Sequence, residues 1–493
     1  MLNLFLFLTF FGAGYADGNT GFSETGSEPY TGIRSAILNF RFTEAEQLIK
    51  KAPVPYLNAF YQVQITAWQY LITEQNERIP VFDTRLESAM DLIESQPETA
   101  ERAYLLGDLQ MWKAIVRMRS EEYVSAAWSG RSAMNHYKEA AELDPKNPDI
   151  RKGTGTMKYV AGAIPSRLTW LASIFGLNGS MAEGIRDLEW SARFGTVSSA
   201  ESRFFLSAIE LFTNRNPEKS IAHLDTLLTQ YPGNGVFVLM KAVALQRDKQ
   251  VPAAVALMEK EYTRFRDTMP AFSDVIRFRI AEGYYFMNRF DKAIPLFEDI
   301  LAKFKGNSLR RLGHFRLGLS YELTGRRKEA LAQYRKIEPN ENNDFDLYMV
   351  SESERWAQTP MSDAEKKAWL GRNYFDAGFF KEAAEQYRLA MELAGKDTRL
   401  IAETHFRLGR LADHQKQTDQ AVREYQLAIK LCPPDHEWIR AQSLFHLGKM
   451  EADAGRKASA LAWYAKADEM EDHLFVNSLH REIDTERKRL DGK

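Results

Sequence analysis

One spacing is written three times between residues 364 and 470, and it limits what this chain can fold into. Each copy has a glycine, an alanine twelve residues later, and a tyrosine four residues after that alanine. Successive glycines are 38 and 39 residues apart. Small residues at these positions let two helices approach closely, and a helix pair that cannot bury its apolar face alone stacks on further pairs. The three sets are Gly371, Ala383 and Tyr387; Gly409, Ala421 and Tyr425; and Gly448, Ala460 and Tyr464.

This spacing resembles the tetratricopeptide repeat, whose pattern is Leu-Gly-x2-Tyr followed by Ala-x3-Phe and a proline. Weaker copies precede the three clear ones, and no segment shows a sustained alternation of apolar and polar residues. We therefore predict an all-α fold, an α-solenoid of tetratricopeptide-like helix pairs that forms a right-handed superhelix. The small residues of the weaker copies are Ala208, Ala242, Ala281 and Gly318.

The pattern also divides the chain. We expect a signal peptide at 1–16, a flexible lead at 17–30, a helical region with degenerate repeats at 31–200, and tetratricopeptide-like repeats at 201–339. An insert at 340–363 separates these from three well-formed repeats at 364–470, and a capping helix follows at 471–493.

The signal peptide is predicted from an apolar run, Leu2 to Phe11, followed by the small residues Gly14 and Ala16 at cleavage spacing. The run is too short to span a bilayer, and no cysteine follows it to carry a lipid. We therefore expect an exported protein of the periplasm or cell envelope of a Gram-negative bacterium.

Residues 154–190 carry a second resemblance. An apolar segment, Ile164-Pro165-Ser166-Arg167-Leu168, precedes the turn Ile174-Phe175-Gly176-Leu177, and a helix begins near Gly184. This arrangement is similar to the inclusion-body-clearance and tetratricopeptide-repeat 39 family, and the resemblance implies no catalytic activity.

Composition and motifs exclude several functions. The net charge is -2, which argues against a general nucleic-acid surface. The single cysteine, Cys432, allows neither an internal disulfide nor a multi-cysteine metal site. No phosphate-binding loop, zinc-protease motif or nucleophile elbow occurs. Lys152-Gly153-Thr154-Gly155-Thr156 has glycines but no following Lys-Ser/Thr, which indicates a helix start or turn. We expect no enzyme activity, no cofactor and no metal.

A binding groove is predicted from the first helix of each pair, which lines the inner face of such a solenoid. Three residues before the small slot the chain is mainly aromatic, and one residue after it the last three copies are basic. An acidic segment or a chain terminus would meet these cations. The predicted groove residues are Phe205, Phe278, Phe315, Arg372, Phe406, Arg410, Phe445 and Lys449.

Two functions remain open. The first is an exported scaffold that binds a protein or peptide partner through its concave groove. The alternative is a carrier of an apolar ligand or lipid, using the apolar segment 159–177 and the phenylalanine row, with possible peripheral membrane contact. The apolar part of the wall could also be covered by the chain's own helices, and the basic residues could form a solvated face.

Overall fold

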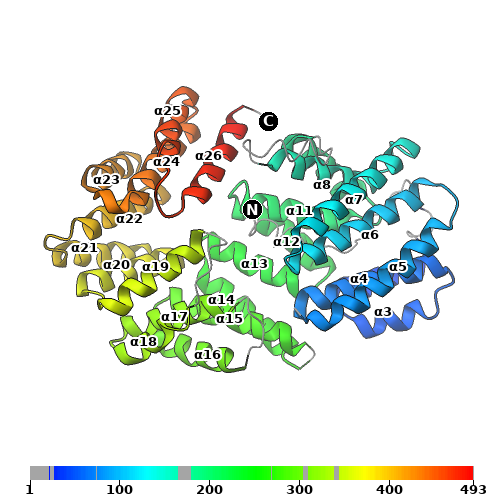
Figure 1. The fold of residues 1–493 in the computed structure, drawn as a ribbon, viewed down its shortest axis with the longest axis horizontal. Coiled ribbons are helices and arrows are strands. Elements are labelled where there is room, and N and C mark those ends of the chain that lie inside the picture. Colours follow the sequence, from blue (N-terminus) through cyan, green and yellow to red (C-terminus); the bar gives the residue numbers. More distant parts are fainter. Residues whose placement is uncertain are drawn as a thin grey trace. The chain divides into compact units, whose positions relative to one another are not determined.

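In a computed structural model of the chain, the described residues are 22, 27–73, 75–164, 179–267, 269–303, 309–337 and 344–491. The predicted signal peptide at 1–16 lies outside them, as do most of the flexible lead and residues 165–177 of the apolar segment. Within the described residues 24 α-helices follow one another and no strand occurs (Figure 1). The predicted all-α solenoid is confirmed.

The chain divides into two compact units, and the boundary between them falls in the sequence between Ala244 and Leu245. The helices of the first unit are α2 (Tyr30–Leu38), α3 (Phe42–Ile49), α4 (Pro55–Thr73), α5 (Ile79–Glu94), α6 (Ala100–Arg119), α7 (Tyr123–Leu143), α8 (Ile150–Ala163), α10 (Met181–Phe194), α11 (Ser199–Phe212), α12 (Pro217–Gln230) and most of α13 (Gly235–Arg247).

The second unit contains the clear repeats. Its helices are α14 (Val251–Phe265), α15 (Pro270–Phe286), α16 (Phe290–Lys303), α17 (Arg310–Leu323), α18 (Arg327–Tyr334), α19 (Asp344–Gln358), α20 (Asp363–Ala377), α21 (Phe380–Leu393), α22 (Thr398–His414), α23 (Thr418–Leu431), α24 (Trp438–Asp453), α25 (Lys457–Asp468) and α26 (Val476–Leu490). The 3₁₀ turn η3 (Pro434–His436) lies between α23 and α24.

The repeat spacing is explained by one contact within each helix pair. A Cβ placed on Gly409 would lie 2.7 Å from the ring of Tyr425 in the second helix. The same contact joins Gly371 to Tyr387 at 2.7 Å and Gly448 to Tyr464 at 2.6 Å. A real Cβ does not approach a ring so closely. The slot is therefore occupied by glycine, because the tyrosine ring lies directly against its Cα.

Each pair also turns at a fixed place. The residue seven positions after the small slot has a positive φ: 91° at Gly378, 59° at Lys416 and 75° at Gly455. A left-handed residue after the last turn of a helix satisfies the terminal carbonyl groups and reverses the chain. Glycine adopts this conformation without strain, whereas lysine does so at a cost.

Helices α8 and α10 pack more closely than the tetratricopeptide pairs. A Cβ on Gly184 would lie 2.6 Å from the carbonyl oxygen of Gly155, so the two backbones touch at this point. Lys152 to Thr156 lie in the first half of α8, within the helix rather than at a separate phosphate-binding turn. Two glycines of the segment 154–190, Gly155 and Gly184, therefore allow α8 and α10 to come into contact.

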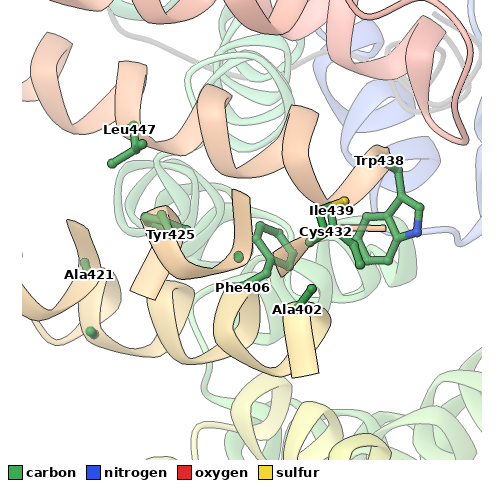
Figure 2. Packing of buried hydrophobic residues seen from close by; sticks show 10 residues of the cluster. Ala402, Phe406, Ala421, Tyr425, Cys432, Trp438, Ile439 and Leu447 are labelled. Carbon is green, nitrogen blue, oxygen red and sulfur yellow. The ribbon is translucent and has the colours of Figure 1, made fainter. Parts of the chain in front are cut away.

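The core of the second unit continues from pair to pair. Figure 2 shows buried residues of one cluster, with Phe406 of α22, Tyr425 of α23 and Ile439 of α24 meeting between three consecutive helices. Tyr425 lies on Gly409 of its own pair and stacks on His446 of the next pair, with ring centroids 5.3 Å apart. One tyrosine therefore closes its own pair and joins it to the following one.

The predicted insert contains a helix, α19, that is outside the regular pairing. Its Trp356 is fully buried and contacts Phe315 and Trp369, with ring centroids 6.1 and 5.2 Å away. The insert therefore joins α17 to α20 through aromatic contacts, where a regular solenoid would place a helix of the next pair.

Candidate functional site

The predicted phenylalanine row lies in the core and not on an open face. Each of these five side chains is at most 4% exposed. Phe278, Phe406 and Phe445 each contact the aromatic residue at the end of the repeat spacing in their own second helix. Phe315 is covered by α19 through Trp356. In the copies that contain Phe278, Phe406 and Phe445, the slot three residues before the small residue faces the second helix. Phe205 instead lines a small cavity of the first unit together with Lys152 and Glu201. The burial of Phe205, Phe278, Phe315, Phe406 and Phe445 corrects the expectation that they line an open groove.

A cleft does occur in the second unit, formed by α19, α20, α22 and the start of α24. Its enclosed space is small, about 20 Å³, which is room for about one water molecule. Three aromatic residues, Tyr348, Trp369 and Trp438, alternate with charged residues along its wall. The charged side chains are Glu352, Glu365, Arg372, Arg399, Glu403 and Arg407.

Most charges in this cleft neutralise one another. Arg399 pairs with Glu365 at 3.1 Å, and Arg407 pairs with Glu403 at 3.0 Å. Burial alone would raise the pKa of Glu403, but Arg407, Arg399 and Arg372 together hold it below its usual value. Glu403 therefore stays ionised, and two of the three guanidinium groups of the cleft are engaged by carboxylates.

Arg372 differs from the other two arginines of the cleft. Its Nη1 donates to the hydroxyl of Tyr348 at 3.0 Å, and its guanidinium lies 4.7 Å from the ring centroid of Trp369. Among the described residues it has no carboxylate within ion-pair distance. Burial alone would lower the pKa of Arg372, but Tyr348, Asp376 and Glu403 raise it. The guanidinium group is therefore near two carboxylates of its own chain, but without a direct ion pair it keeps N–H donors for another acceptor.

The predicted basic slot forms a row of neighbours. Arg372 and Arg410 both act on Asp376: burial alone would raise the pKa of that carboxyl, but Lys249, Arg410 and Arg372 hold it far below its usual value. Burial raises the pKa of Asp413, and Lys449 and Arg410 oppose this shift. Arg372, Arg410 and Lys449, here called the basic row, therefore alternate with two aspartates, and Arg372 alone of the three lines the cleft.

The first unit holds a buried charge cluster that the sequence pattern did not indicate. The ammonium group of Lys152 lies 2.5 Å from Asp108 and 2.6 Å from Glu201, and the hydroxyl of Tyr137 donates to Asp108 at 2.5 Å. These groups come from α6, α7, α8 and α11. The Lys-Gly-Thr-Gly-Thr segment thus contributes a buried lysine, and its Gly153 lets Tyr137 pack beside it.

Two carboxylates in this cluster contact the single ammonium group of Lys152. Its one positive charge cannot balance two negative charges. Burial raises the pKa of Glu201 to about 7 despite Lys152 beside it. Burial alone would lower the pKa of Lys152, but Asp108 and Glu201 raise it instead. Lys152 is therefore charged at neutral pH, and Glu201 exchanges its proton near neutral pH.

The repeat pattern predicted one residue of the cleft, Arg372, but not its aromatic residues Tyr348 and Trp438. Arg372 occupies a repeat slot, so its spacing identified it. Tyr348 lies in the insert and Trp438 precedes the third repeat, and neither position carries a periodic signal. In the part of the chain that the structure describes, no group of three metal-ligating side chains comes together, and no helix is both long and apolar enough to cross a membrane.

These observations define the class of protein. Residues 278–344 and 370–436 match the tetratricopeptide repeat, in agreement with the helix pairs described above. Residues 109–305 match the family described as Iml2/Tetratricopeptide repeat protein 39. The chain is a tetratricopeptide-repeat protein. It resembles the Iml2/tetratricopeptide repeat protein 39 family across α8 and α10, as the residues around Gly155 and Gly184 predicted. No curated protein matches the chain in sequence.

Several solved structures match the chain over most of their length with low TM-scores. A human IFIT1 dimer with m7Gppp-AAAA is 18% identical, with 94% of this chain and 95% of that chain covered and a TM-score of 0.31. Yeast Tom70 is 12% identical, covers 89% and 88%, and has a TM-score of 0.32. The APC/C hetero-tetramer Cut9-Hcn1 is 14% identical, covers 95% and 92%, and has a TM-score of 0.30. At these TM-scores none of the three supports a conclusion about what this chain binds.

Proposed function

We propose that this chain is a non-catalytic scaffold for a protein partner, and that an acidic segment of that partner binds in the cleft and along the basic row. Stacked helix pairs of this kind provide extended binding surfaces. The observation that supports the proposal most directly is Arg372, a cation without an ion pair among the described residues, in a cleft with Tyr348 and Trp369.

The chemistry of the cleft favours a carboxylate as the group bound there. The planar guanidinium group can bind a carboxylate through two parallel hydrogen bonds. Such charge-assisted hydrogen bonds are about twice as strong as hydrogen bonds between neutral groups. Arg372 is partly enclosed, so the interaction is less screened by solvent than an exposed ion pair. Arg410 and Lys449 lie beyond the cleft beside Asp376 and Asp413, which offset part of their charge, so they add a weaker contact for a second acidic residue of the same segment.

The test removes the basic row and keeps the fold. The triple variant Arg372→Ala, Arg410→Ala, Lys449→Ala should retain the helical circular dichroism signal and should lose the main partner captured from host extract after crosslinking. The matched control is Lys381→Ala, Lys396→Ala, Arg423→Ala, which removes the same charge from exposed positions of the same unit. Equal recovery of the partner by all three proteins would contradict the proposal.

The apolar-ligand alternative receives no support from the described residues. Its phenylalanine row is buried in the core, and residues 165–177 of its apolar segment are outside the described residues. We therefore do not carry it further.

We also propose that the chain is exported to a bacterial cell envelope, on the apolar run and the small residues at its start. Sequencing the N-terminus of the native protein should begin near Asp17. A product that retains Met1 would contradict export by this signal.

A further inference from the structure

The segment 470–475, here called the C-terminal strap, leads from α25 to α26 and ends at the aromatic wall of the cleft. The ring of Phe475 lies 5.3 Å from that of Tyr348 in α19 and 6.0 Å from that of Trp438 in α24, measured between centroids. Tyr348 and Trp438 both line the cleft. Phe475 therefore joins two walls of the cleft that come from residues nearly a hundred positions apart.

The backbone at Phe475 is held in an unfavourable conformation. Its φ is 73° and its ψ is 12°, which is the left-handed region. Among the described residues every other non-glycine residue with positive φ ends the first helix of a pair, whereas Phe475 begins α26. A bulky residue in this region is an outlier, and such strain concentrates at clamps and switches.

A polar contact holds the strap in place. The carboxylate of Asp344, at the start of α19, accepts hydrogen bonds from the backbone N–H of Ser478 at 2.6 Å and from the side chain of Asn477 at 3.2 Å. A carboxylate on the first turn of a helix compensates free N–H groups there. The first turn of α26 is thus fastened to the helix that also carries Tyr348.

We propose that Phe475 is a built-in occupant of an aromatic subsite of the cleft, and that a partner segment with an aromatic side chain next to acidic residues displaces it. This inference rests on the proposed function and names the partner chemistry of that site. The strap itself has this composition, because Glu471 and Asp472 precede Leu474 and Phe475.

The contacts of Tyr348 are the reason why we expect the partner segment to carry an aromatic side chain next to an acidic one. Its ring contacts Phe475, and its hydroxyl accepts from Arg372. The aromatic subsite and the cation therefore meet on one side chain. A partner segment that places an aromatic ring against Tyr348 and Trp438 brings a neighbouring carboxylate within reach of Arg372.

The test uses the full chain and a fluorescent peptide of residues 469–478, EMEDHLFVNS, as the probe. Wild type should bind weakly, because the subsite is occupied. Phe475→Ala empties the subsite and should bind at least tenfold more tightly. Asp344→Ala loosens the strap without altering the ring, and it should also tighten binding. Phe475→Tyr keeps an aromatic ring and should behave as wild type.

Two further arms address the chemistry. A peptide with alanine in place of its phenylalanine should lose the affinity for the Phe475→Ala chain. Adding Arg372→Ala to that chain should weaken binding of the unchanged peptide.

Equal affinity of wild type, Phe475→Ala and Asp344→Ala, or no binding to any of them, would overturn the inference. Neither result bears on the capture of the host partner by the basic row, so the two proposals fail separately.

Discussion

At Gly409 the backbone of one helix meets the ring of Tyr425 in the next, and this contact sets the repeat spacing at the scale of single residues. A Cβ there would lie 2.7 Å from the ring, so Gly409→Ala must displace the tyrosine or part the helices. We expect the variant to be destabilised by about 1–3 kcal/mol, the usual cost of overpacking a core. Urea unfolding followed by circular dichroism measures this change.

The control for this substitution is Gly130→Ala. Gly130 lies inside α7, and a Cβ there would meet no atom within 4 Å. An alanine inside a helix is more favourable than glycine by about 0.5–1 kcal/mol, so this variant should gain stability. A gain in stability by both variants would mean that helix propensity outweighs the tyrosine contact at Gly409, which would contradict this explanation of the slot.

The buried cluster around Glu201 predicts a pH dependence of the first unit. The pKa of Glu201 is about 7 in the folded chain and near its ordinary value of 4.5 when unfolded. Between these values the folded state binds more protons, so its stability falls as pH rises from about 4.5 to 7. Glu201→Gln removes this contribution, which we expect to amount to about 1–3 kcal/mol.

The measurement is the free energy of unfolding at pH 5 and pH 8 for Glu201→Gln and for the exposed control Glu218→Gln. The control should lose stability over this range as wild type does, and Glu201→Gln should lose less. The groups that face Glu201 are Lys152, Asp108 and Asp149, and all three are present in both variants.

At the scale of secondary-structure elements, the turn inside each helix pair can be tested at one repeat position. Glycine is introduced there in one pair and removed in another. Lys416 has φ 59° and Gly455 has φ 75° at equivalent positions of consecutive pairs. Lys416→Gly relieves a left-handed side chain and should stabilise by up to about 1 kcal/mol, after the entropy of glycine is subtracted. Gly455→Ala should destabilise by about 1 kcal/mol or more. Thermal melts of the two variants should therefore shift in opposite directions.

How far the elements could be predicted depended on whether they repeat. The pairs from α20 to α25 were predicted from the glycine, alanine and tyrosine slots, because each slot is a contact between neighbours in sequence. The role of α19 could not be predicted, because it is a single helix whose Trp356 packs on residues of two separate pairs. The phenylalanine row was predicted to line a groove. An apolar repeat position has the same sequence pattern whether its side chain faces a groove or is buried in the core.

The charge cluster shows the same limit at longer range. Asp108 and Lys152 are 44 residues apart, and Glu201 follows in another helix pair. No spacing rule joins them, and only the packing of four helices brings them together. By contrast Arg372, Arg410 and Lys449 occupy one slot in three successive copies, so the sequence alone suggested that they would be neighbours.

At the scale of the whole molecule, the proposed partner site lies in the second unit. Regular pairs provide most of the cleft there, and the unpaired helix α19 contributes Tyr348 and Glu352. Its aromatic wall comes from Tyr348, Trp369 and Trp438, and Arg372 provides its free donors. A function located in this cleft depends on contacts within one unit and needs no fixed relation between the two.

Hydrogen exchange of the full chain, with and without its purified host partner, tests this central claim most directly. We expect slower exchange at the cleft helices α20 and α22 when the partner is bound, and faster exchange at the first turn of α26 as the strap is displaced. Protection confined to the first unit, or to the second helices α21 and α23 of these pairs, would contradict the proposed site.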